Sequence, residues 1–92
     1  MAILSASELE AVLTNVLLTI EKVIAERGSA PKLEGARDDL TRAMTQARVP
    51  AKLKALRAQL DTAADIVQTE IPNDGKLLDS MWDILDYVDY RT

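Results

Sequence analysis

Residues 5–28, SASELEAVLTNVLLTIEKVIAERG, form the longest uninterrupted segment of the chain and the one richest in large aliphatic side chains. Ser5 and Glu8 have the spacing of a capping box, in which the serine hydroxyl accepts from the amide of the third helical residue and the glutamate reaches back to the amide of the cap. Gly28 stands where a left-handed C-cap is expected. The two ends therefore predict a helix over residues 6–27.

Apolar residues recur inside this segment at helical spacing, and at about 100° per residue they cover one broad face. These residues are Leu9, Val12, Leu13, Val16, Leu17, Ile20, Val23 and Ile24. Leu4 and Leu9 are spaced to form the hydrophobic staple that accompanies a capping box, although Ser7 with Glu10 offers a second start for the helix. We expect this face to form one side of the hydrophobic core.

Leu18 lies on the opposite side of the same predicted helix. Ala11 and Ala25 stand one heptad before and after it, so the outer face carries a seam of small, large and small side chains. A single exposed leucine is common and needs no function. The alternative is that Ala11, Leu18 and Ala25 form a shallow self-association surface.

Prolines and turn residues divide the rest of the chain into three further predicted helices, over residues 31–48, 50–71 and 75–90. Pro31 and Pro50 both suit the first turn of a helix. Pro50 also disfavours helical geometry at the preceding residue, which favours a reversal of the chain over a kink in one continuous helix. The last predicted helix follows four consecutive turn formers, two of which are able to cap it, Asn73 and Asp74.

Each predicted helix carries an apolar stripe, and the short connections between helices favour antiparallel neighbours. The sequence thus predicts an all-α fold, a small antiparallel four-helix bundle with up-down-up-down topology, in a single domain over residues 1–92. We expect its core to contain Val16, Ile20, Leu40, Leu60, Met81 and Leu85.

The composition argues against an enzyme. The chain has 92 residues, of which 28% are charged and 48% are hydrophobic, and it contains no cysteine and no histidine. Disulfides, thiolate metal sites and catalysis by a histidine base are therefore excluded. We expect no catalytic residue, no cofactor and no metal site.

Paired carboxylates one helical turn apart, Asp79 with Asp83 and Asp61 with Asp65, raise the alternative of a magnesium site. All-helical nucleotide pyrophosphohydrolases hold magnesium in this way, but they need Glu-x-x-Glu followed by Glu-x-x-Asp. This pair of motifs is missing from the sequence. The predicted function is therefore not enzymatic.

The chain also lacks the features of a membrane protein or of a secretory leader. No segment reaches the roughly 20 apolar residues that span a bilayer, and residues 1–7 have neither a basic region nor a long apolar run. A cytoplasmic location is the expectation.

Charge is distributed unevenly along the sequence, although the net charge is only −4. Residues 40–60 contain five bases and no acid, whereas residues 61–92 contain eight acids and two bases. The bases predict a positively charged end of the molecule, here called the basic end, which consists of Arg42, Arg48, Lys52, Lys54 and Arg57. It offers a contact for an anion or for nucleic acid.

The last predicted helix combines carboxylates with every aromatic residue of the chain. Its predicted partner-binding residues are Asp79, Trp82, Asp83, Asp86, Tyr87 and Tyr90. Aromatic residues rimmed by charge are typical of interface hot spots, and the carboxylates favour a partner with a basic surface. The alternative is a solvated face, with Trp82 closing the core and the two tyrosines covering the end of the bundle.

These patterns support three functional hypotheses. The leading one is a non-enzymatic protein-binding bundle, of the inhibitor, immunity-protein or adaptor type, by analogy with small acidic helical proteins that block a basic partner. The second is a self-associating structural protein that forms a homo-oligomer. The third, nucleic-acid binding through the basic end, is the least favoured, because a helix-turn-helix alignment places Arg42, Gln46 and Arg48 where apolar packing is expected.

Overall fold

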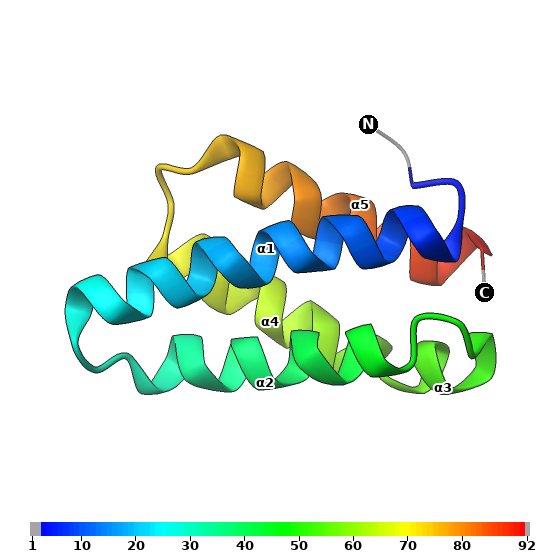
Figure 1. Ribbon diagram of the computed structural model, residues 1–92, viewed down its shortest axis with the longest axis horizontal. Helices are drawn as coiled ribbons and strands as arrows, with labels where there is room; N and C mark the ends of the chain where they lie inside the picture. The colour runs from blue at the N-terminus through cyan, green and yellow to red at the C-terminus, as the bar shows by residue number, and fades with distance from the viewer. Residues whose placement is uncertain (1–2, 92) are drawn as a thin grey trace.

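A computed structural model describes residues 3–91 of the chain, and over these residues it contains helices and no strand. The all-α prediction is therefore confirmed. The helices are α1 (Ala6–Arg27), α2 (Pro31–Thr45), α3 (Pro50–Ala55), α4 (Arg57–Glu70) and α5 (Gly75–Arg91), and they pack compactly (Figure 1).

Both ends of α1 follow from the local sequence. The Ser5 hydroxyl accepts a hydrogen bond from the Glu8 amide at 3.2 Å, as predicted. The Glu8 carboxylate, however, accepts from the amide of Leu4 at 2.9 Å rather than from that of Ser5. Gly28 ends the helix with φ of 79°, and its amide donates to the Ile24 carbonyl at 2.9 Å. A residue with a Cβ atom adopts this left-handed conformation only with strain, which explains the glycine.

The predicted staple between Leu4 and Leu9 is wrong. Leu4 is 58% exposed, whereas Ile3 is 5% exposed and belongs to the core. Ile3 rather than Leu4 is thus the residue of this segment that enters the core.

The predicted helix over residues 50–71 is interrupted at Leu56, so that α3 and α4 are separate. The Leu56 amide donates to the Leu53 carbonyl at 3.0 Å, a tightened i to i+3 bond, and Leu56 has φ of −88° and ψ of 2°. No helix breaker stands at this position, so local propensity does not explain the interruption. The interruption accompanies contacts of α3 with both α5 and α4.

The predicted helix over residues 31–48 ends earlier, at Thr45, whose hydroxyl donates to the Arg42 carbonyl at 2.8 Å. The chain then reverses before Pro50, because α2 and α4 pack side by side (Figure 1). The predicted reversal at this proline is thus confirmed.

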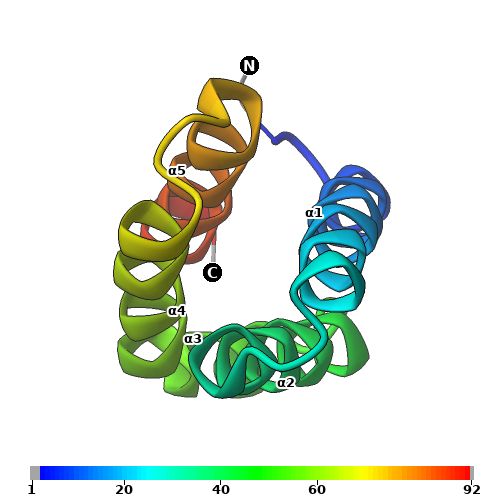
Figure 2. The ribbon, with the colours of Figure 1, turned by 90° about the vertical axis from the view of Figure 1, so that its left-hand side faces the viewer.

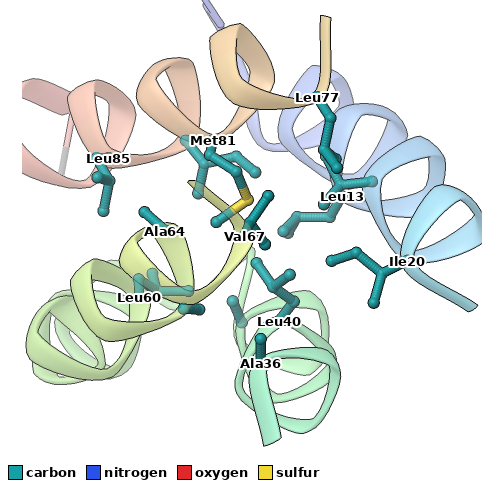
Figure 3. Close-up of a cluster of buried hydrophobic side chains, with 14 of the residues drawn as sticks. Leu13, Ile20, Ala36, Leu40, Leu60, Ala64, Val67, Leu77, Met81 and Leu85 are labelled. Carbon is teal, nitrogen blue, oxygen red and sulfur yellow. The ribbon is translucent and has the colours of Figure 1, made fainter. Parts of the chain in front are cut away.

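The long helices surround one core. Viewed along the molecule, α2 lies between α1 and α4, and α5 lies between α4 and α1 (Figure 2). Figure 3 shows side chains from all four converging on a common centre. The six predicted core residues are between 0% and 2% exposed, which confirms them: Val16, Ile20, Leu40, Leu60, Met81 and Leu85.

Candidate protein-binding surface

The orientation of α5 is determined by its cap and its apolar stripe. The Asp74 carboxylate accepts from the Leu77 amide at 3.0 Å, so Asp74 rather than Asn73 begins the helix. The inward side chains of α5 are all buried, namely Leu77, Met81, Ile84, Leu85 and Val88. Because helical side chains three and four apart share a face, Asp79, Asp86 and Tyr90 lie on the opposite, outward side of α5.

The six predicted partner-binding residues of α5, here called the α5 face, differ in exposure. Asp79 and Asp86 are exposed, Trp82 is 48% exposed and Tyr90 is 83% exposed. Asp83 is half-buried, and Tyr87 is half-buried and packs against the core. Trp82 therefore does not close the core, which was the alternative to a binding role for it.

The structure brings four of these six residues together around one cavity of about 250 Å³, here called the tyrosine pocket. Its lining residues are Ile3, Asp83, Asp86, Tyr87, Tyr90 and Arg91. Asp79 and Trp82 lie outside it, nearer the start of α5. The α5 face is thus a pocket at one end of the helix and an exposed acidic and aromatic surface beside it.

Two residues of the tyrosine pocket were not predicted from the sequence. Ile3 comes from the segment before α1 and is 5% exposed, and Arg91 is the last residue of α5. Arg91 was identifiable as a basic residue in the last turn of an acidic helix. The role of Ile3 has no local signal, because its contact depends on how α1 packs beside α5.

Asp89, which also lies on α5, is held by a bidentate ion pair with Arg57 of α4. The two hydrogen bonds from Arg57 to Asp89 are 2.7 and 3.2 Å long, and Asp61 lies 3.6 Å from the same guanidinium. The hydrogen bond from Arg57 holds the pKa of Asp89 below its usual value, and the same bond raises the pKa of Arg57. Asp89 is thus committed to Arg57 within the chain.

The basic end is largely neutralised by the rest of the chain. Arg48 contacts Glu10 at 2.7 Å and the Ser7 hydroxyl at 3.2 Å, which joins the turn after α2 to the start of α1. Arg57 pairs with Asp89, as described above, and Arg42 lies 3.8 Å from Asp39 in the same helix. Lys52 and Lys54 are exposed and form no ion pair within residues 3–91.

The predicted self-association seam lies on the outer side of α1. Ala11 and Ala25 are exposed, and Leu18 is 60% exposed. The structure thus places these three residues on the surface.

A second cavity, of about 300 Å³, lies between α1 and the start of α5. Its lining residues are Asn15, Val16, Thr19, Asp74, Lys76, Leu77 and Ser80. Asp74 is already used as the cap of α5. Nowhere in residues 3–91 do three or more carboxylates gather in a geometry that would hold a metal ion. Within the same residues, every helix is too short or too polar to cross a membrane.

Comparison of the chain with known protein families, with curated proteins and with solved structures gives no match. The candidate function therefore depends on the geometry and charge of the surface itself.

Proposed function

We propose that this chain is a non-enzymatic protein-binding domain, of the inhibitor or adaptor type, and that its α5 face contacts a partner with a basic surface. One observation carries the proposal: exposed aromatic side chains and unpaired carboxylates coincide on one helix. Trp82 and Tyr90 are exposed, and Asp79 and Asp86 form no ion pair with any other residue in the described part of the chain.

The two kinds of residue have complementary roles in such a contact. Tryptophan and tyrosine supply large, rigid areas that dominate the energy of many interfaces. Carboxylates increase the rate of encounter with a basic partner and discriminate against acidic ones. Leu18 on α1 is also an exposed apolar residue, but its helix contains no aromatic residue.

We also propose that α3 and α4 together form one arm of an antiparallel four-helix bundle. Three long-range contacts support alternating helix directions. Arg48 to Glu10 joins the turn after α2 to the start of α1, and Arg57 to Asp89 joins the start of α4 to the end of α5. Arg27 to Glu70 joins the ends of α1 and α4. Distances between spin labels placed at the helix ends would test this arrangement.

The proposed contact is tested by reversing charge on the α5 face. The variant Asp79→Lys/Asp86→Lys changes two exposed residues and should leave the fold intact. Affinity capture from a lysate of the source cells, with identification of the retained proteins, should recover a basic partner with the unmodified chain and lose it with this variant. Retention should also weaken as salt increases, because exposed charges are screened over about 8 Å at physiological ionic strength.

The matched control is Lys52→Glu/Lys54→Glu, which reverses the two exposed lysines of the basic end. It should retain the same partner as the unmodified chain. If the α5 variant retains the partner and the lysine variant loses it, the contact lies at the basic end and the proposal is wrong. A nucleic acid among the retained species, lost only in the lysine variant, would instead support the third hypothesis.

The exposure of Leu18 favours self-association as a second candidate. Sedimentation of the purified chain should then show a dimer that the substitution Leu18→Lys converts to a monomer. A monomer at all accessible concentrations would remove this candidate.

A further inference from the structure

The tyrosine pocket is lined by aromatic, acidic and apolar side chains. Two aromatic rings, Tyr87 and Tyr90, and two carboxylates, Asp83 and Asp86, line it together with the buried side chain of Ile3. It also lies at the C-terminal end of α5, next to Arg91. We propose that this pocket receives the cationic side chain of a lysine or arginine from the partner.

The inference rests on the proposed function, because it names the anchor through which a basic partner would be held. The volume of the pocket favours such a guest. At about 250 Å³ it is smaller than the roughly 300–1,000 Å³ of sites that hold drug-sized ligands or cofactors. A single long side chain is a better match to this space.

The charge around the pocket favours a cation. Two carboxylates, Asp83 and Asp86, and one guanidinium, that of Arg91, line the pocket. The carbonyl end of α5 adds the negative pole of the helix dipole. Asp83 has an interaction elsewhere in the chain, so Asp86 is the carboxylate assigned to the guest. Asp86 is exposed and forms no ion pair with another residue within 3–91.

The tyrosine rings distinguish this pocket from an acidic surface patch. A cation over the face of an aromatic ring is attracted by the negative charge above that face, and lysine and arginine are the side chains that use this contact. Tyr87 packs against the core and is therefore held in place, whereas Tyr90 is 83% exposed and free to cover a guest. Ile3 adds an apolar wall for the methylene stem of the guest side chain.

The test uses three capped peptides of equal length with the full chain: hexalysine, hexaarginine and hexacitrulline, in which citrulline is the neutral counterpart of arginine. Binding is followed by NMR. Hexalysine or hexaarginine should shift the ring signals of Tyr87 and Tyr90 and the methyl signals of Ile3 in a saturable way, and hexacitrulline should not. The stronger of the two cationic peptides identifies the preferred guest.

Variants separate the ring contact from simple charge attraction. Tyr90→Ala should weaken binding of the cationic peptide about two- to fivefold, which corresponds to the loss of one exposed cation–π contact, whereas Tyr90→Phe should keep the affinity. Asp86→Asn should also weaken binding. Its matched control, Asp65→Asn on α4, removes the same charge from an exposed position away from the pocket and should have little effect.

Two outcomes would overturn the inference. Shifts confined to the Trp82 indole and the Asp79 amide would show that cations bind the exposed surface and not the pocket, which would leave the proposed function standing. Equal shifts with hexacitrulline would show that charge is irrelevant to the pocket. Loss of the partner in Asp79→Lys/Asp86→Lys tests the proposed function separately.

Discussion

The α5 face and the basic end have opposite charge, and they also differ in how many of their charged side chains form ion pairs within the chain. In the basic end, Arg48 and Arg57 are engaged by carboxylates of α1 and α5 at 2.7 Å. On the α5 face, Asp79 and Asp86 remain without ion pairs among the described residues, beside exposed aromatic rings. A cluster of charge in a sequence is thus a candidate site only where the fold has not already paired it.

The substitution with the largest expected effect tests whether one core supports both the α5 face and the basic end. Leu60 of α4 is fully buried among α2, α4 and α5 (Figure 3). Leu60→Ala should lower the free energy of unfolding by about 2–5 kcal/mol, because it removes buried methyl groups and leaves a cavity. Urea denaturation followed by far-UV circular dichroism and by fluorescence of Trp82, the one tryptophan of the sequence, measures this loss.

The control for this substitution is Leu18→Ala, which shortens an exposed leucine and should change stability by less than about 0.5 kcal/mol. The two probes should give coincident transitions, since a single core unfolds cooperatively. Separate transitions for Trp82 and for total helix content would show that α5 unfolds independently. In that case the α5 face and the basic end would not share one cooperative core.

A smaller effect is expected from breaking the ion pair that links the two regions. Arg57→Gln removes the bidentate contact with Asp89 and should destabilise the protein, whereas Lys52→Gln, which removes an exposed lysine without an ion pair among the described residues, should not. Urea denaturation of both variants at low and moderate salt measures the difference. Equal stability of the two variants would mean that Arg57 contributes no more to the stability of the fold than Lys52.

The same ion pair predicts a pH dependence in acid. The pKa of Asp89 is lower in the folded chain than its ordinary value of 3.8, so the unfolded chain takes up a proton first as the pH falls. The stabilisation is therefore complete above pH 3.8 and is lost as the pH falls through the lowered pKa of the folded state. The raised pKa of Arg57 adds no dependence in this range, because both states keep that guanidinium protonated.

Stability curves of the unmodified chain and of Arg57→Gln from neutral pH to pH 2 test this dependence. The difference between the two proteins should be constant near neutrality and should shrink below the ordinary pKa of aspartate. A difference that is the same at every pH would show that Asp89 is not the partner that matters.

The smallest expected effect concerns the second arginine of the basic end. Arg48→Gln breaks the contacts with Glu10 and Ser7, but the arginine side chain is 64% exposed, so the loss should be at most about 1 kcal/mol. Thermal denaturation at low salt measures it, and high salt should reduce it further. A loss as large as that of Leu60→Ala would show that the basic end is part of the structural core.

Much of the fold was predictable because its causes are local. The cap at Ser5, the glycine at the end of α1 and the periodic apolar stripes are determined by residues within one or two turns, and the six predicted core residues are buried. The positions of Asp79, Asp86 and Tyr90 on the surface follow from the same periodicity, since they lie on the side of α5 opposite its buried residues.

The sequence by itself thus determined the helices, their inward faces and the separation of charge. Only the tertiary structure decided the interruption at Leu56, the burial of Ile3 in place of Leu4, and the pairing of Arg57 with Asp89. The pairing joins residues 32 positions apart, and the interruption accompanies the contact of α3 with α5. Such contacts depend on how separate helices pack, whereas hydrophobic periodicity reports only which side of each helix is buried.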